Sequence, residues 1–305
     1  MTLHEPPAYF GNTFTRTIHA KAEGPTDPAN NLLPPRYVVV ITGAGKGLGH
    51  DISIAYAKAG ASGICISSRT QSDLDNLKKK LLEINPKVDV LAQICDTTSE
   101  SDVERLADAV NSHFKRVDTV IANAGIISKY KEDGTLPVGI DDPDFDRVIT
   151  INLLGSRRVA KHFIPQLAAT VDGPQNFVVI TSLASHSTDS YYCPIAYNVS
   201  KLAINRLAEH IHNDHGKDGI LAFAVHPGAV VTPQTAKHST EKGDKWEQVL
   251  TDDPGLAGGF LTWLTKEKRE WLSGRYISVT WDVEELEQQK DKIVAKDKLK
   301  MRMVV

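Results

Sequence analysis

The chain has 305 residues, of which 41% are hydrophobic and 24% charged, so it can bury the core of one doubly wound α/β domain. Its formal net charge of −3 gives no basic field of the kind that attracts nucleic acid or anionic lipid. These values argue against nucleic acid or a membrane as partner and favour a small-molecule substrate.

The N-terminal segment predicts an arm rather than a core element. Residues 1–35 hold six of the fifteen prolines and no sustained apolar period, as expected for an arm that lies on the domain or is partly disordered. They lack the features of a signal peptide, and no later run is long enough to span a membrane. The three cysteines, Cys65, Cys95 and Cys193, fit no disulfide or metal pattern. We therefore expect a soluble, cytoplasmic protein without a metal site.

Short apolar runs alternate with helix-like segments from residue 37 onward. The runs are apolar nearly throughout, which is typical of strands buried on both faces of a parallel sheet. They cover 37–42, 63–68, 88–94, 118–123, 176–182, 220–225 and 275–280, with helix-like segments at 51–60, 71–85, 99–114, 146–167 and 197–215. This order predicts an α/β, doubly wound Rossmann fold with a central parallel sheet of about seven strands flanked by helices. We place this dinucleotide-binding and catalytic domain at 36–281, with a helical tail at 282–305.

A glycine-rich loop follows the first strand and opens a helix, and this context separates a nucleotide-binding loop from a simple glycine turn. Glycines let the backbone approach a pyrophosphate, and the helix N-terminus supplies free N–H groups and partial positive charge. The loop residues expected at the cofactor are Thr42, Gly43, Gly45, Lys46, Gly47, Leu48 and Gly49.

The end of the second strand indicates which cofactor is used. An NAD enzyme places a carboxylate there for the ribose 2′-hydroxyl, whereas this chain has Ser68 and Arg69. A guanidinium binds a 2′-phosphate that a carboxylate would repel, and Lys46 adds a second cation. The sequence therefore favours NADP(H) over NAD(H).

Tyr197 and Lys201 form the strongest chemical signal. Residues four apart share a helix face, so the lysine cation is expected to lower the pKa of the tyrosine. A phenol tuned in this way exchanges a proton with a substrate oxygen while hydride moves at the adjoining carbon.

These motifs, in this order, resemble the short-chain dehydrogenase/reductase family over residues 37–279. The glycine spacing is T-G-x-x-x-G-x-G, and the tyrosine pair is Y-x-x-x-K. The resemblance implies further cofactor contacts at Asp96, Thr97, Asn123, Ala124, Gly125, Pro227, Gly228, Val230 and Thr232, besides Tyr197 and Lys201. It also implies that Asn152 helps to hold a water that links the lysine to solvent.

Two serines are candidates for the catalytic hydroxyl. The family most often has a serine 13 residues before the tyrosine, where this chain has Ala184. We choose Ser182 because it ends the strand, and Ser185 remains the alternative. A hydroxyl in this place stabilises charge that develops on the substrate oxygen.

The resemblance implies an NADP(H)-dependent oxidoreductase that acts on a carbonyl or alcohol carbon, similar to filamentous-fungal members of small-molecule biosynthesis. Tyr191, Tyr192, Cys193 and Trp246 are candidate pocket residues for a ring-bearing substrate, and 231–255 is the expected lid. Family members commonly form homodimers or homotetramers through their long helices. The alternatives are non-redox chemistry, such as isomerisation or cyclisation, and an NADP(H)-binding regulator.

Overall fold

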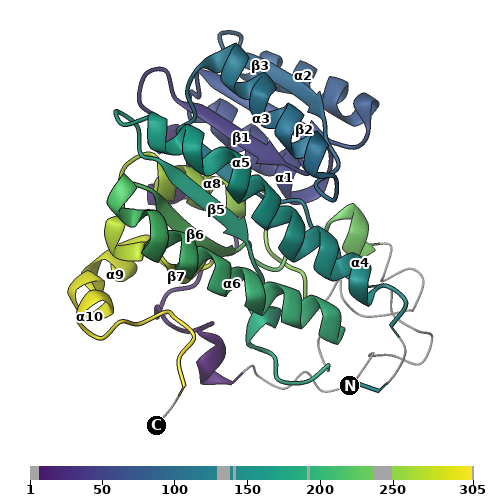
Figure 1. Cartoon of the computed structure of the whole chain (residues 1–305). Coiled ribbons are helices and arrows are strands. Elements are labelled where there is room, and N and C mark those ends of the chain that lie inside the picture. Colours follow the sequence, from purple (N-terminus) through teal and green to yellow (C-terminus); the bar gives the residue numbers. More distant parts are fainter. Residues whose placement is uncertain (1–6, 129–137, 140–141, 191–192, 237–248, 304–305) are drawn as a thin grey trace.

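A seven-stranded parallel sheet forms the centre of the molecule in a computed structural model that describes residues 7–128, 138–139, 142–190, 193–236 and 249–303 (Figure 1). The strands run in the order β3-β2-β1-β4-β5-β6-β7. Their bounds are β1 Val38–Thr42, β2 Gly63–Ser68, β3 Asp89–Ile94, β4 Thr119–Ala122, β5 Asn176–Ile180, β6 Leu221–His226 and β7 Arg275–Ser278. The predicted doubly wound Rossmann fold is confirmed, and each predicted strand is present to within two residues.

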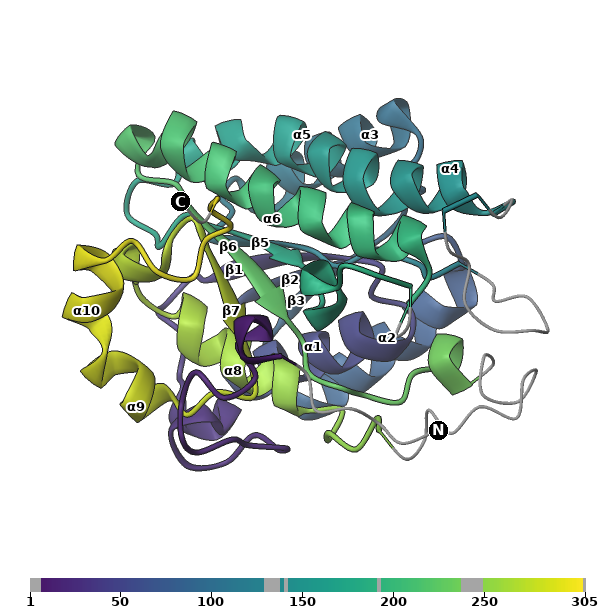
Figure 2. The same cartoon turned by 90° about the horizontal axis from the view of Figure 1, so that it is seen from below.

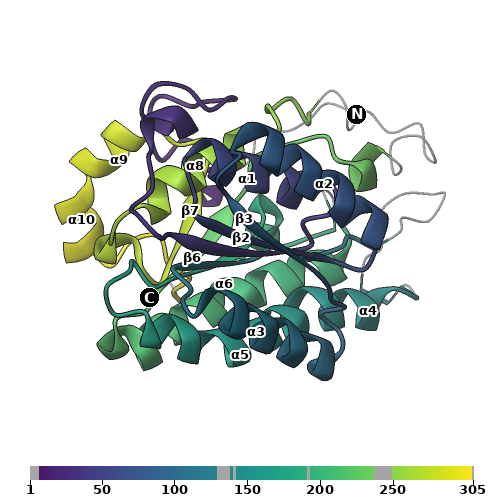
Figure 3. The same ribbon diagram turned by 90° about the horizontal axis from the view of Figure 1, so that it is seen from above.

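Two helical layers cover the two faces of this sheet (Figure 3). One layer holds α1 Gly47–Lys58, α2 Gln71–Ile84 and α8 Leu256–Thr265, and the other holds α3 Glu100–Phe114, α5 Ser156–Ala169 and α6 Ile195–His215. The buried hydrophobic residues accordingly form two clusters, one on each side of the sheet. Apolar residues on both faces of each strand are therefore buried, which explains why the strand sequences do not alternate.

Local sequence sets the ends of several helices. Ser99 caps α3 by accepting a hydrogen bond from the Asp102 amide, and α6 begins directly after Pro194. Helix α8 is buried on all sides, so its sequence carries no helical stripe, and sequence analysis did not predict it.

The described part of the N-terminal arm lies against the domain beside α8 (Figure 2). It contains three short 3₁₀ helices, η1 Ala8–Phe10, η2 Gly24–Thr26 and η3 Pro28–Asn30. A side chain at Gly259 of α8 would collide with Ala22 and the carbonyl of Thr26, because the arm approaches the helix backbone closely.

The C-terminal tail forms two short helices, α9 Val283–Gln288 and α10 Lys290–Ala295, rather than one. Leu286 and Ile293 are fully buried, so the tail contributes to the core besides facing solvent. The Trp281 indole donates to the carbonyl of Gly11 (2.9 Å), and His19 contacts Asp282 (2.8 Å). Arm and tail are thus held together.

None of the described helices combines the length and apolar character needed to cross a membrane. The strand order changes direction between β1 and β4. In open α/β sheets, the crevice that binds the ligand lies at such a switch point, outside the carboxyl ends of the strands. The glycine loop and most of the predicted site residues follow those strand ends.

Candidate active site

The glycine loop leaves β1 with two residues in the left-handed region that favours glycine. The φ angles are +67° at Gly43 and +58° at Gly47. A Cβ at Gly43 would lie 2.8 Å from the backbone of Ala124. A Cβ at Gly49 would lie 2.5 Å from the side-chain amide nitrogen of Asn123. Glycine is therefore required for the close contact between this loop and the end of β4.

Thr42 and Asn123 hold the two strand ends together. Thr42 Oγ1 accepts hydrogen bonds from the backbone amides of Asn123 (3.1 Å) and Ala124 (3.2 Å). The Asn123 side chain donates in return to the carbonyl of Thr42 (2.8 Å). These two predicted site residues therefore hold the start of the glycine loop against the end of β4.

The N-terminus of α1 suits an anionic group. Its N-cap residue is Lys46, whose side chain makes no capping hydrogen bond, so the N-cap leaves the amides of the first turn available to a ligand. Free amides and the helix dipole are the features that bind a pyrophosphate. The loop therefore fits a dinucleotide.

Two predicted cations lie beside the loop, and each has an acidic neighbour. Lys46 Nζ is 3.2 Å from Asp73 Oδ2, and an Arg69 guanidinium nitrogen is 3.9 Å from Asp96 Oδ2. Asp73 was not predicted as a site residue, because the carboxylate that selects a nucleotide is expected at the tip of β2. The position of Asp73 in the first turn of the helix after β2 was the feature of the sequence that could have predicted it.

Ser68, Asp96 and Thr97 shape the neighbouring turns. Ser68 Oγ accepts from the amide of Thr70, and Asp96 Oδ1 accepts from the amide and hydroxyl of Thr98. Thr97 is buried, and a Cβ at Gly155 would lie 2.9 Å from its hydroxyl.

Asn152 lies in a π-helical turn. Helix α4 (Phe145–Ile149) continues through this turn, η4 (Thr150–Gly155), into α5. Single π turns inside longer helices often occur at functional sites. The Asn152 amide exchanges two hydrogen bonds with the backbone of Ile126 and donates to Ser200 Oγ of α6 (3.0 Å). It is almost completely buried.

Lys201 points toward the end of β5. Its ammonium group donates to the carbonyl of Ile180 (2.8 Å) and lies 5.4 Å from the centre of the Tyr197 ring. Burial lowers the pKa of Lys201 to about 8. A Cβ at Gly125 would come within 3.5 Å of this ammonium group and 3.3 Å of Asn152 Oδ1. The glycine of the N-A-G motif thus leaves room beside both side chains.

The pKa of Tyr197 differs from the prediction. Burial raises it well above the ordinary value of 10.0, the neighbouring Cys193 also raises it, and Ser182 lowers it only in part. The predicted lowering by Lys201 is therefore not seen, because desolvation of the phenol outweighs a cation that is already bonded to a carbonyl. The phenol keeps its proton at neutral pH.

The two candidate serines have different partners. Ser182 lies near enough to the Tyr197 phenol to lower its pKa, whereas the buried Ser185 accepts a hydrogen bond from the Asn205 side-chain amide of α6 (3.0 Å). Both lie at the short 3₁₀ helix η5 (Leu183–His186), with Ser182 as its N-cap. The geometry favours Ser182 as the serine at the phenol.

The turn after β6 is fixed by an acid that sequence analysis missed. Asp252 accepts a hydrogen bond from the amide of Ala229 (2.6 Å), and Val230 pairs with it in an isolated β-bridge. Gly228 has φ +85°, and a Cβ there would lie 2.8 Å from the Asp252 carboxylate. Asp252 lies within a polar segment that resembles a lid, and no local motif distinguished it.

Thr232 closes the crevice next to the glycine loop. A Cβ at Gly47 would lie 3.4 Å from the Thr232 side chain, whose hydroxyl pairs with that of Thr235 (3.2 Å). Pro227 begins this turn. The candidate pocket residues Tyr191, Tyr192 and Trp246, and residues 237–248 of the expected lid, lie outside the described residues.

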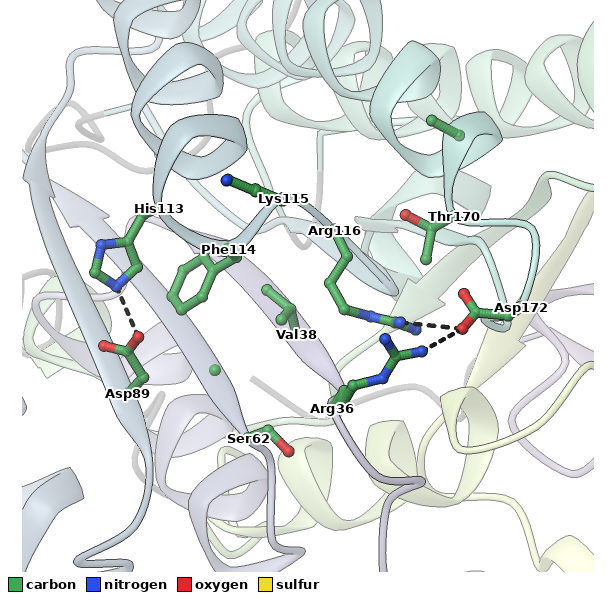
Figure 4. A pocket seen from close by; sticks show the side chains of 12 residues that line it. Arg36, Val38, Ser62, Asp89, His113, Phe114, Lys115, Arg116, Thr170 and Asp172 are labelled. Atoms are coloured by element: carbon green, nitrogen blue, oxygen red, sulfur yellow. Dashed lines mark hydrogen bonds and ion pairs between the residues drawn. The ribbon is translucent and has the colours of Figure 1, made fainter.

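A hollow of about 530 Å³ lies at the opposite end of the sheet, near the start of β1 and β2 (Figure 4). Two of its cations, Arg36 and Arg116, both contact Asp172, at 2.6 and 3.3 Å. Because these charges are compensated and no predicted motif reaches the hollow, we assign it no part in the reaction. Among the described residues, no three His, Cys, Asp or Glu side chains are grouped to hold a metal ion.

A Rossmann sheet with a glycine loop at its switch point and a Tyr–Lys pair beside it defines a nicotinamide-dependent oxidoreductase. Residues 37–243 match the family model described as short chain dehydrogenase. The chain therefore belongs to the short-chain dehydrogenase/reductase family.

Curated relatives from filamentous fungi match nearly the whole chain. Short chain dehydrogenase pgmD of Aspergillus terreus is 38% identical and covers 100% of this chain and 98% of its own. Short chain dehydrogenase pigC of Monascus ruber is 34% identical, with 95% and 93% covered. Among solved structures, a variant of the actinorhodin polyketide ketoreductase with NADPH shares the fold at 22% identity and a TM-score of 0.67, covering 80% of this chain and 95% of its own.

Proposed function

We propose that this protein is an NADP(H)-dependent oxidoreductase that transfers a hydride between the nicotinamide and a carbonyl or alcohol carbon of a small organic molecule. The observation that carries the proposal is the arrangement around Tyr197. The Tyr197 ring lies beside the Lys201 ammonium group, Ser182 lies near enough to lower the pKa of the phenol, and Asn152 lies across Gly125 from the ammonium group. This arrangement supports a role for Tyr197 as the acid/base group, with the other three residues supporting it.

The residues have separate tasks in the reduction direction. When bound, the nicotinamide supplies the hydride chemistry. Tyr197 donates its proton to the substrate oxygen, which suits a phenol whose pKa is raised and which stays protonated. Ser182 donates a hydrogen bond to the same oxygen, and Lys201 restores the proton of Tyr197 with the support of Asn152.

The glycine loop and the free end of α1 would hold the dinucleotide phosphates, and the turn from Pro227 to Thr232 would hold the nicotinamide carboxamide. We propose NADP(H) as the preferred cofactor because Lys46 and Arg69 extend into solvent beside the loop, with side-chain exposures of 64% and 63%. Their acidic neighbours form only surface ion pairs, which cost little to exchange for a phosphate.

The substrate class follows from the relatives. We propose a ring-bearing carbonyl compound of fungal secondary metabolism, since the relatives are fungal and a polyketide ketoreductase shares the fold. We further propose a cytoplasmic homodimer or homotetramer that uses the helices around Asn152 and Tyr197. Leu154, Val199 and Leu202 are exposed apolar side chains on those helices, and the three cysteines, all among the described residues, form no disulfide.

The test is NADPH and NADH binding by the purified full chain, followed by NADPH consumption with a panel of ketones, quinones and aldehydes. Tight NADPH binding with turnover that Tyr197→Phe abolishes supports the proposal. Binding without turnover of any carbonyl favours an isomerase, a cyclase or a regulator. Failure to bind either nucleotide contradicts the proposal.

A further inference from the structure

Strand β6 ends in a histidine whose ring contacts the catalytic loop. His226 Nδ1 lies 3.2 Å from the backbone nitrogen of Leu183. A backbone N–H can only donate, so Nδ1 must be the unprotonated acceptor of a neutral ring. Burial lowers the pKa of His226 to about 3, and the charge of His186 lowers it further, so the ring remains an acceptor at neutral pH.

This bond lies next to the serine that contacts Tyr197. On the near side, the Thr181 amide donates to the carbonyl of Val225 in β6 (2.8 Å), and its hydroxyl donates to the carbonyl of Lys201 (3.1 Å). On the far side, Leu183 is attached to His226. Ser182 thus lies between Thr181, which is bonded to the backbone of β6, and Leu183, which is bonded to the side chain of His226.

We propose that His226 is a positioning residue, which holds Ser182 in place for the reaction by accepting the hydrogen bond of the Leu183 amide. The inference rests on the proposed function and deepens it. Without the acceptor, the first turn of η5 loses its attachment to β6 while the end of η5 stays bonded through Ser185. Ser182 is then no longer held in one geometry beside the phenol.

Two substitutions separate this role from simple packing. In His226→Asn, the side-chain oxygen is bonded to Cγ as Nδ1 is, so it can replace the acceptor. In His226→Leu, a methyl group takes the same place and accepts nothing. With NADPH and 9,10-phenanthrenequinone, we expect the Asn variant to keep a kcat close to the wild type. We expect the Leu variant to lose about tenfold to a hundredfold in kcat, with an unchanged KM for NADPH.

Amide hydrogen exchange tests the bond without turnover. Leu183 should exchange slowly in the wild type and in His226→Asn, and at least about tenfold faster in His226→Leu. If the wild type reduces no carbonyl, the proposed function fails while this measurement still decides about the bond. Equal kcat values in the two variants, or equal exchange in all three proteins, overturn the inference.

A variant on the donor side covers the case in which His226→Leu does not fold. Leu183→Pro removes the N–H at the first position of η5, where proline is tolerated. Ser182 has φ −156° and ψ 155°, the extended conformation that precedes proline readily. We expect the same loss of kcat as in His226→Leu, and an unchanged kcat contradicts the proposal.

Discussion

The two halves of the crevice hold their polar groups in different ways. On the side of β4–β6, Asn152 and Lys201 are buried and bonded to backbone carbonyls or amides. On the side of β1–β3, Lys46 and Arg69 are largely exposed, and within the described part of the chain their ion pairs are with Asp73 and Asp96. The half proposed for proton transfer is therefore organised before any ligand binds, whereas the half proposed to select the nucleotide is adaptable. Substitutions should consequently affect chemistry sharply in one half and affinity gradually in the other.

Tyr197→Phe gives the largest expected effect. Removal of the hydroxyl eliminates the proton donor, so kcat should fall by at least about a hundredfold. The NADPH dissociation constant should stay close to the wild-type value, because the ring remains. Steady-state kinetics and fluorescence titration measure the two quantities.

Tyr276→Phe is the matched control. Its hydroxyl is buried without a hydrogen-bond partner among the described residues, so its loss should leave kcat unchanged. Equal kcat values for Tyr197→Phe and the wild type would contradict the proposed role of Tyr197 as proton donor, and with it the proposed difference between the two halves.

The pH dependence should report Lys201. In the reduction direction we expect kcat/KM of the free enzyme to fall up to about tenfold per pH unit as pH rises through about 8, because the lysine, whose pKa burial lowers to about 8, loses its charge. Below pH 8 the cation is present and the rate should level off. A Lys201→Met variant should lose most activity and show no such decline, and a wild-type rate that rises through pH 8 contradicts the assignment.

Substitutions in the exposed half should change affinity for one nucleotide. Arg69→Ala and Lys46→Ala should each weaken NADPH binding about tenfold, because each removes a charge-assisted contact to the 2′-phosphate, and NADH binding should hardly change. Asp73→Asn should strengthen NADPH binding a little by freeing Lys46. Arg36→Ala, in the hollow at the other end of the sheet, is the control. Equal losses for NADPH and NADH would reject the proposed preference.

Acid stability gives the smallest expected effect. Burial lowers the pKa of His186 to about 4 from its ordinary value of 6.5, so the folded protein binds this proton later than the unfolded chain does. Stability is therefore complete above pH 6.5 and decreases by roughly 2 kcal/mol between pH 6.5 and pH 4. His186→Phe keeps a ring against Tyr276, 4.5 Å away in the wild type, and should flatten this part of a urea-denaturation profile. An unchanged slope argues against a buried neutral ring.

Local sequence was enough for part of this structure. The seven strands and the glycine loop could be predicted because their signals are contiguous, and Tyr197 and Lys201 because helical spacing alone puts them on one face. Asp252 and His226 could not be found in this way. Asp252 acts on Ala229, 23 residues before it in the chain, and His226 acts on Leu183, 43 residues before it. Such pairs form only when segments separated in the sequence fold together.

The direction of the shift in the pKa of Tyr197 also could not be predicted from the sequence, because the degree of burial of a phenol is a property of the packed site. Spacing likewise could not separate Ser182 from Ser185, since a short 3₁₀ helix sends the two hydroxyls to different partners.

The contact between arm and tail has a consequence for synthesis. Gly11 accepts a hydrogen bond from Trp281, and the Thr17 hydroxyl donates a hydrogen bond to Glu285. Both partners lie about 270 residues away in the chain. At about 5–20 residues per second, the arm emerges from the ribosome tens of seconds before the surface that receives it. It therefore settles last, although it is made first. A chain that ends before Trp281 and a chain that lacks the arm should both expose the face of α8 around Gly259, so the two defects should give the same aggregation behaviour.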